Sequence, residues 1–105
     1  MAKHITSSDH FDEEVKKSEK VIMADFYADW CSPCRKIAPV VEELAEKYQH
    51  CITVVKVNVD SHEALSDKYE VNQMPTFVFI KDDKEVDRFV GGSESLLKDR
   101  IAKNC

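Results

Sequence analysis

Residues 21–35 have the sequence Val21-Ile-Met-Ala-Asp-Phe-Tyr-Ala-Asp-Trp-Cys-Ser-Pro-Cys-Arg35. The apolar run at 21–28 is typical of a strand, and because only Asp25 interrupts it, we expect a central strand that is covered on both faces. Apolar side chains after Cys34 recur with the period of an amphipathic helix, at Ile37, Val40, Val41, Leu44, Ala45 and Tyr48. Two cysteines therefore lie where a strand gives way to a helix.

The position of these cysteines has a chemical consequence. Pro33 suits the first turn of the helix, so Cys31 is expected at the helix N-terminus and Cys34 one turn inside. Unpaired N–H groups and the positive end of the helix dipole favour a negative charge there, which for Cys31 is the nucleophilic thiolate. Residues three apart share a helix face, so we predict that Cys31 attacks a disulfide in another protein and that Cys34 resolves the mixed disulfide.

Other uses of the Cys-x-x-Cys motif are disfavoured. A structural zinc site needs a second pair at ligand spacing, which the remaining candidates do not supply: Cys51, Cys105, His4, His10, His50 and His62. Covalent haem needs His directly after the second Cys, where this chain has Arg35, and a structural disulfide closing so small a loop removes little chain entropy. We expect Cys51 to be an inert buried thiol and Cys105 to be mobile, exposed and able to form intermolecular disulfides.

Length and composition indicate one ordinary globular domain spanning residues 1–105, with 43% hydrophobic and 33% charged residues. The net charge of −5 argues against nucleic acid or an anionic membrane as a partner. Residues 1–6 do not resemble a signal peptide, and no apolar run approaches membrane-spanning length. We therefore expect a cytoplasmic monomer, in a reducing compartment where paired cysteines are more often catalytic than structural.

The hydrophobic patterns predict elements in the order β-α-β-α-β-α-β-β-α. Strands are expected at 3–6, 21–28, 51–59, 76–80 and 86–90, the last two forming an antiparallel hairpin around the polar turn 81–84. Helices are expected at about 9–18, from the cysteines to about 49, after Asp60 and Ser61 as caps, and after Ser93 or Ser95. The last helix would bury Leu96, Leu97 and Ile101. A mixed sheet with helices on both faces is the natural packing.

Short motifs follow one another along the chain: Ala24-Asp25-Phe26, Trp30-Cys-x-Pro-Cys34, Ile37-Ala-Pro39, Lys56-Val-Asn-Val-Asp60, Met74-Pro-Thr-Phe77 and Val90-Gly91-Gly92. Together they resemble the thioredoxin family over nearly the whole length. The resemblance implies an α/β thioredoxin fold, with a five-stranded mixed sheet in the order 1-3-2-4-5 flanked by four helices. It also implies a protein dithiol–disulfide oxidoreductase with no bound cofactor or metal. A flavin-containing thioredoxin reductase would recharge it with electrons from NADPH, and its substrates would be disulfide-containing proteins such as peroxiredoxins or ribonucleotide reductase.

The resemblance also assigns roles to residues around the cysteines. Asp25 would lie beneath the disulfide and assist deprotonation of Cys34, and burial should raise its pKa. Lys56 would lie near this aspartate and influence its ionisation, although a lysine reaching from a strand to solvent is an equal reading. Thioredoxins usually have Gly where this chain has Ser32. Because the pair between the cysteines tunes redox poise in this fold, Ser32-Pro33 is expected to set the reduction potential of this chain.

A further set of residues is expected to receive the substrate. For Pro75 the resemblance implies a cis bond after Met74, facing the cysteines and presenting the Met74 backbone to an extended substrate segment. A routine proline at a strand edge is the alternative. The expected contact surface, here called the docking rim, consists of Trp30, Met74, Pro75, Val90, Gly91 and Gly92.

Two other functions are compatible with parts of the sequence. A disulfide oxidase or isomerase of the same fold tends to carry His before the second Cys, where this chain has Pro33. A redox-silent binding module would use the scaffold to hold a partner, with the cysteines incidental. The intact dithiol, with an aspartate and an expected cis-proline around it, argues against the binding module, and a measured reduction potential would separate the reductase from the oxidase.

Overall fold

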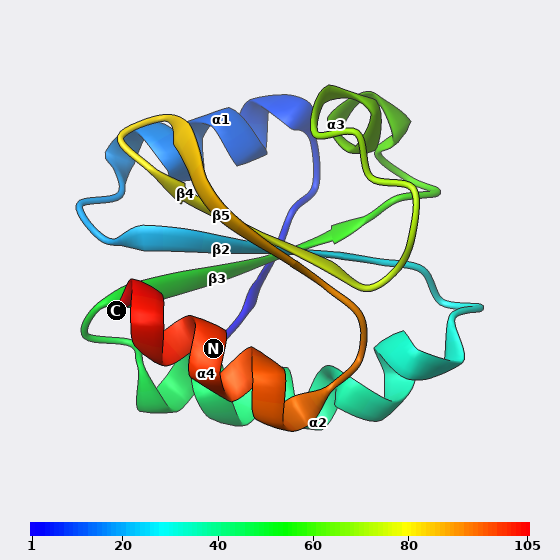
Figure 1. The fold of residues 1–105 in the computed structure, drawn as a ribbon. Helices are drawn as coiled ribbons and strands as arrows, with labels where there is room; N and C mark the ends of the chain where they lie inside the picture. The colour runs from blue at the N-terminus through cyan, green and yellow to red at the C-terminus, as the bar shows by residue number, and fades with distance from the viewer.

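The computed structural model describes residues 1–105 and shows one sheet with helices on both faces (Figure 1). The strands are β1 (Lys3–His4), β2 (Val21–Tyr27), β3 (Ile52–Asn58), β4 (Thr76–Lys81) and β5 (Lys84–Val90). The helices are α1 (Ser8–Lys17), α2 (Ser32–Lys47), α3 (Glu63–Lys68) and α4 (Glu94–Asn104). None of these helices combines the length and the hydrophobicity that crossing a membrane requires.

The strands lie in the order β1-β3-β2-β4-β5, which confirms the topology expected from the sequence. β1 and β2 both pair with β3 in parallel, whereas β4 runs antiparallel to β2 and β5 antiparallel to β4. β2 therefore has a neighbour on each side and a helical layer on each face. This position explains why residues 22–26 are all buried and why the strand is almost continuously apolar.

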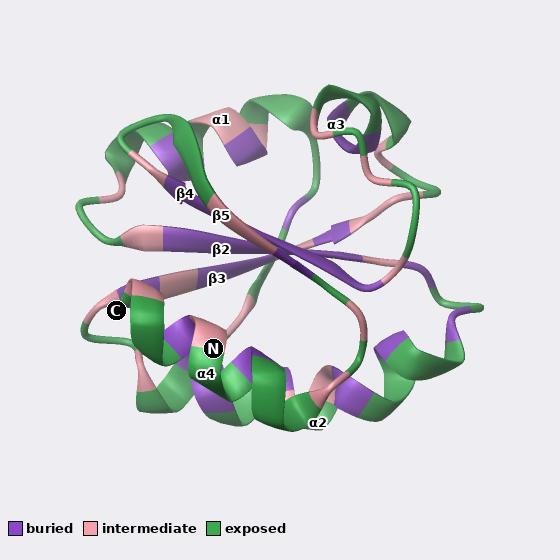
Figure 2. Ribbon diagram, viewed as in Figure 1, coloured by how far each residue is buried: buried purple, intermediate pink, exposed green.

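Successive residues of each strand contribute to two separate cores, because side chains alternate between the faces of a sheet (Figure 2). On the face covered by α2 and α4, the buried side chains include Met23, Ile37, Val41, Leu44, Phe77, Phe79, Leu97 and Ile101. On the face covered by α1 and α3 they include Ile5, Phe11, Ile22, Phe26, Val55, Leu65, Val78 and Ile80. The odd-numbered positions of β2 thus face α2, which matters for Asp25.

The last helix differs from its predicted orientation at one residue. Leu97 and Ile101 are buried as expected, but Leu96 is 54% exposed, so its assignment to the inner face was wrong. Leu97 and Ile101 are four residues apart and lie on one stripe of α4, whereas Leu96 is turned about 100° away from Leu97. Ser93, one of the two predicted caps, accepts a hydrogen bond from the Leu96 N–H.

The turns before α3 and between β4 and β5 also differ from the prediction, because α3 begins later and the β4–β5 turn is tighter. The N-cap of α3 is His62, without a side-chain capping bond, so the expected caps Asp60 and Ser61 were wrong. Their backbone N–H groups instead donate to Oδ1 of Asn58. The β4–β5 turn consists of two residues with positive φ, Asp82 and Asp83, which is the geometry of a two-residue hairpin loop.

Cys51 and Cys105 form a disulfide, which corrects the expectation of two free thiols. Their Cα atoms lie 5.2 Å apart although the residues are separated by 54 positions in the sequence. Cys51 is half-buried in the α2–β3 turn, and Cys105 at the end of α4 is exposed but covalently held. The bond ties the last helix to the end of α2.

The cross-link should contribute to the stability of the oxidised protein. A closed loop of this length removes chain entropy from the unfolded state equivalent to about 4 kcal/mol. We expect Cys105→Ser, at an exposed position, to lower the free energy of unfolding by about 2–4 kcal/mol, measured by guanidinium titration. The variant Cys31→Ser/Cys34→Ser is the matched control, because the loop it opens is short. Equal losses in the two variants would contradict the loop-length argument.

Candidate active site

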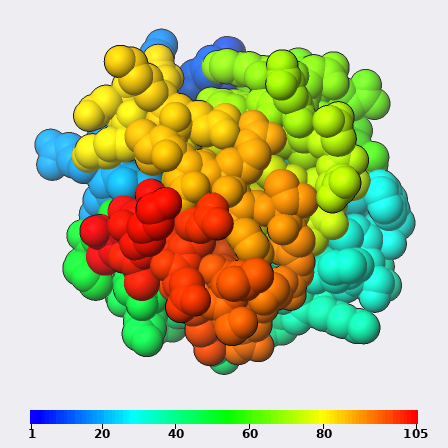
Figure 3. Space-filling model, viewed as in Figure 1, coloured from blue at the N-terminus to red at the C-terminus, as the bar shows by residue number.

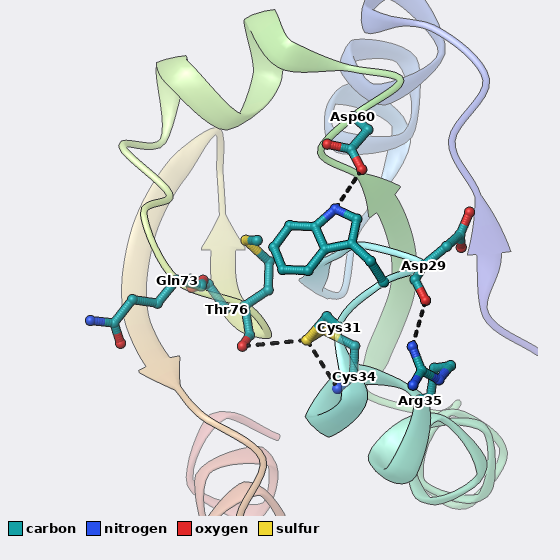
Figure 4. The surroundings of a disulfide bond; sticks show 9 residues. Asp29, Cys31, Cys34, Arg35, Asp60, Gln73 and Thr76 are labelled. Carbon is teal, nitrogen blue, oxygen red and sulfur yellow. Dashed lines mark hydrogen bonds between the residues drawn. A yellow bond between two sulfur atoms is a disulfide. The ribbon is translucent and has the colours of Figure 1, made fainter.

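Cys31 and Cys34 form a disulfide at the start of α2, with their Cα atoms 5.3 Å apart. Cys31 is the N-cap of the helix, and its sulfur accepts a hydrogen bond of 3.2 Å from the backbone N–H of Cys34 (Figure 4). Both side chains are buried, whereas Ser32 and Pro33 between them are exposed. The expected placement, Cys31 at the helix N-terminus and Cys34 inside the first turn, is confirmed.

The approach to this turn is held by backbone contacts. The Cys31 N–H donates to the Ala28 carbonyl, and the Arg35 N–H donates to the Cys31 carbonyl. The Arg35 side chain turns back, and its Nη1 donates to the Asp29 carbonyl at 2.7 Å (Figure 4). The sulfur of Cys31 thus lies at a helix end whose geometry is fixed on both sides, where backbone dipoles favour a thiolate.

Asp25 lies in the centre of the sheet and is 3% exposed. It has the same parity on β2 as Met23, so its side chain is on the face covered by α2, the helix that carries the cysteines. Its neighbours in register are Lys56 on β3 and Phe77 on β4, and its Oδ1 has no hydrogen-bond partner. Burial raises the pKa of Asp25 to about 7, and the charge of Lys56 lowers it in part.

Lys56 combines the two roles considered for it. It is the register partner of Asp25 and is half-buried, but its Nζ lies 4.7 Å from the centre of the Tyr27 ring. A pocket at the surface is lined by Tyr27, Cys34 and Lys56 among others. Cys34 and the cation that faces Asp25 therefore share one solvent-accessible hollow.

The Met74–Pro75 peptide bond is cis, as the family resemblance implied. The carbonyl oxygen of Met74 lies 3.6 Å from the Cys31 sulfur, and neither the N–H nor the C=O of Met74 takes part in a backbone hydrogen bond. Pro75 itself is buried, and its carbonyl accepts from the Gly91 N–H at 2.9 Å. The unpaired backbone N–H and C=O groups next to the Cys31 sulfur are therefore those of Met74. The buried Pro75, held by its hydrogen bond from Gly91, fixes their position.

The docking rim surrounds the disulfide with exposed apolar surface. Trp30 is 66% and Val90 is 45% exposed, and Met74 is half-buried. Gly91 has a φ of 115°, a conformation that side chains rarely adopt, and a Cβ on Gly92 would lie 3.2 Å from the Cβ of Pro33. The two glycines let the loop after β5 pass close to the cysteine turn.

One residue of the site was not assigned a role from the sequence. Oδ2 of Asp60 accepts a hydrogen bond of 2.9 Å from Nε1 of Trp30 (Figure 4). Asn58 in turn accepts from the Asp60 N–H and places Nδ2 3.5 Å from the Asp29 carboxylate. Asn58 and Asp60 both belong to the motif that begins at Lys56, which was noticed in the sequence. No local pattern, however, links Asp60 to a tryptophan 30 residues earlier.

Comparison with known proteins supports one family. The family model described as Thioredoxin matches residues 2–103. Thioredoxin-T of Drosophila melanogaster is 43% identical over 96% of this chain, which spans 65% of that longer protein. Thioredoxin-2 of Saccharomyces cerevisiae is 38% identical, with 99% of both chains covered.

Solved structures agree with these relatives. The thioredoxin of Fasciola hepatica superposes with a TM-score of 0.93 at 41% identity, covering 98% of this chain and 99% of that one. That of Plasmodium falciparum superposes with a TM-score of 0.94 at 36% identity, covering 99% and 100%. With a disulfide-bonded cysteine pair in the expected place on the expected fold, this chain belongs to the thioredoxin family of protein disulfide oxidoreductases.

Proposed function

We propose that this protein works in the direction of reduction and opens disulfides in other proteins. The observation that carries the exchange chemistry is the Cys31 sulfur at the N-terminus of α2, hydrogen-bonded by the Cys34 N–H. The direction of reduction is supported by Pro33 before Cys34, where an oxidase of the same fold tends to carry His. In the reduced state this arrangement stabilises a thiolate on Cys31, and the thiolate is the attacking form of cysteine. Cys34 is one turn away and can close the ring without a backbone rearrangement.

The electrons move in two exchanges. The Cys31 thiolate attacks one sulfur of the target disulfide, forms a mixed disulfide and expels the other target sulfur as a thiolate. Cys34 then loses its proton and attacks the Cys31 sulfur, which releases the second target sulfur. The target gains two electrons as a dithiol, and the protein is left with the Cys31–Cys34 disulfide seen in the structure.

Asp25 is proposed as the proton acceptor for Cys34. Its pKa of about 7 lets it exchange protons at neutral pH, and its unpartnered Oδ1 leaves a site free to accept one. Its position on the α2 face of β2 supports this role. Lys56, beside it in register, would favour the ionised form, and the shared pocket of Cys34 and Lys56 would admit water for the transfer.

Substrate docking is proposed at the rim. An extended segment of the target would pair with the free backbone groups of Met74, in the manner of a strand added to a sheet edge. Trp30 and Val90 would contribute apolar contacts on either side. Asp60 would hold the indole in position through the hydrogen bond to Nε1.

The proposed cycle needs a partner that returns electrons. We propose a flavin-containing thioredoxin reductase that uses NADPH, and this electron transfer requires no metal or prosthetic group on this chain. Peroxiredoxins and ribonucleotide reductase are candidate substrates. The cytoplasm is the proposed compartment, because a working dithiol needs reducing surroundings. One relative is named as a chloroplastic thioredoxin, so microscopy of a tagged protein is the appropriate check.

Reduction of insulin disulfides, followed by turbidity, tests the proposal. The wild-type protein should accelerate precipitation with dithiothreitol, and again with NADPH plus thioredoxin reductase. Cys31→Ser should abolish the acceleration, and Cys34→Ser should accumulate a mixed disulfide that a non-reducing gel detects. A measured reduction potential separates a reductase from an oxidase of the same fold. A double variant Cys31→Ser/Cys34→Ser that keeps the full biological activity would instead support a redox-silent binding module.

Replacing Asp25 should change the dependence of stability on pH. The folded pKa of about 7 lies above the ordinary 3.8, so the stabilising contribution is complete below pH 3.8 and is lost as the pH rises through 7. The rise in pKa corresponds to at most roughly 4 kcal/mol. Asp25→Asn should therefore be more stable than wild type at pH 8 and similar at pH 3.5, measured by urea unfolding. A constant difference across this range would contradict the assignment.

The same variant tests the proton transfer. Single-turnover reduction of a protein disulfide by Asp25→Asn should be slower than wild type, by about 10²-fold if Asp25 is the base. The deficit should be largest above pH 7, where the wild-type carboxylate is ionised. Equal rates for the two proteins across pH 6–9 would remove Asp25 from the mechanism.

Trp30→Ala tests the docking rim. Loss of the exposed indole should raise KM for insulin about fivefold or more, while the rate with a small disulfide such as oxidised glutathione changes little. Val86→Ala is the matched control, since Val86 is 52% exposed on β5 outside the rim. Equal changes toward both substrates would assign Trp30 to the chemical step.

A further inference from the structure

A second group of sulfur and imidazole side chains lies away from the Cys31–Cys34 site. The ligand atoms of His50, Cys51 and Cys105 all lie within 4.8 Å of one another, and Nε2 of His50 is 3.7 Å from the Cys105 sulfur. Figure 1 shows the chain's C-terminus beside the start of β3, at the end of the sheet opposite the start of α2. The two cysteine pairs therefore cannot exchange within one molecule.

We propose that this group is a redox-gated metal site. When the Cys51–Cys105 disulfide is reduced, His50, Cys51 and Cys105 bind one thiophilic divalent cation, with Zn²⁺ as the best match. Two thiolates and one imidazole form a donor set that zinc uses in proteins with an open fourth position. His50 and Cys105 are exposed and Cys51 is half-buried, so an ion and a fourth water ligand can enter. Figure 3 shows the end of α4 at the surface.

One distance in the oxidised protein is already close to what a tetrahedral ion requires. Zinc–sulfur and zinc–nitrogen bonds of about 2.3 and 2.0 Å place the nitrogen about 3.5 Å from each sulfur, and the sulfurs about 3.8 Å apart. His50 Nε2 already lies 3.7 Å from the Cys105 sulfur. After reduction the two sulfurs only have to separate, which rotation of the exposed Cys105 side chain allows.

Contacts other than the disulfide hold α4 and its terminal cysteine in place. The Asp87 carboxylate on β5 accepts hydrogen bonds from Arg100 Nη1 at 3.0 Å and from Asn104 Nδ2 at 2.8 Å. Lys103 adds an ion pair to the same carboxylate. The last turn of α4 therefore remains docked on β5 when the sulfur–sulfur bond is broken.

The turn that carries the other two ligands is held as well. The Cys51 N–H donates to the Tyr48 carbonyl at 3.0 Å, and the Cys51 carbonyl accepts from the Val21 N–H. The His50 ring stacks on the Tyr48 ring, with the centroids 6.4 Å apart. Reduction thus frees two sulfur donors next to the imidazole of His50. Because the backbones of all three residues are already positioned, the entropic cost of binding an ion is lowered.

The chemistry balances with a dithiol as reductant. The dithiol gives two electrons and two protons to the Cys51–Cys105 disulfide and becomes a disulfide itself. Binding of the cation then releases the two thiol protons, while neutral His50 donates the lone pair of Nε2. The same sulfurs cannot hold the ion and the covalent bond together. Thiol–disulfide exchange with a disulfide oxidant, which takes the two electrons and becomes a dithiol, therefore re-forms the Cys51–Cys105 bond and expels the metal.

Cobalt(II) is the probe for the first test, in the variant Cys31→Ser/Cys34→Ser, which removes the competing dithiol. The protein is reduced with dithiothreitol, desalted without oxygen and titrated with Co²⁺. We expect one Co²⁺ per chain with thiolate charge-transfer and tetrahedral d–d absorption, displaced by Zn²⁺ and absent from the oxidised sample. Equal binding by oxidised and reduced protein, or no binding by the reduced protein, would overturn the site.

Substitutions then identify the ligands. Adding Cys105→Ser should abolish the charge-transfer band, and adding His50→Ala should weaken Co²⁺ binding about tenfold or more. His4→Ala is the matched control, because His4 is also exposed but lies on β1 outside the cluster. Circular dichroism confirms that each variant is folded. Unchanged affinity in His50→Ala would overturn the three-ligand assignment, and so would a loss in His4→Ala. Because the background variant lacks Cys31 and Cys34, the result is independent of disulfide reductase activity.

Discussion

The hydrogen bond from the Cys34 N–H to the Cys31 sulfur depends on the placement of α2 as a whole. The helix is fixed on the sheet by Ile37, Val41 and Leu44, all of which are buried. Its N-terminal N–H groups therefore have one direction, and the sulfur that caps them lies in one place. The position of the Cys31 sulfur therefore depends on side chains packed one to three helical turns away. Protein cores are close-packed, which leaves the helix little freedom to shift.

The same core contains a carboxylate with an oxygen that receives no hydrogen bond. Asp25 lies between Lys56 and Phe77 in the sheet, and one of its oxygens has no partner. An apolar residue at this position would give a more stable strand, so the aspartate conflicts with the rule that buried polar groups are paired. Such conflicts are expected where chemistry requires them, and this one lies on the face of β2 that α2 covers.

The sequence predicted the features that depend on local periodicity, spacing and family motifs. The apolar run of β2, the helix after Cys34 and the order of the strands were all confirmed. Leu96 was misassigned because it and Leu97 are adjacent in the sequence and both lie close to one helical turn before Ile101. Three apolar residues on one short helix are too few to show which of the two leucines shares the buried stripe with Ile101. The Cys51–Cys105 bond and the approach of His50 depend on where α4 ends in space, which no spacing along the chain encodes. The zinc site proposed on His50, Cys51 and Cys105 is separate from the Cys31–Cys34 motif and depends on the same tertiary approach of α4.

Trp30 is the single tryptophan of the chain, and Asp60 fixes its indole next to the Cys31 turn. Light absorbed by tryptophan at long ultraviolet wavelengths therefore excites one ring in one known place. A neighbouring disulfide quenches indole fluorescence by accepting an electron, whereas a dithiol does so less. The fluorescence intensity of Trp30 should therefore follow the opening and closing of the Cys31–Cys34 disulfide in real time, without an added label.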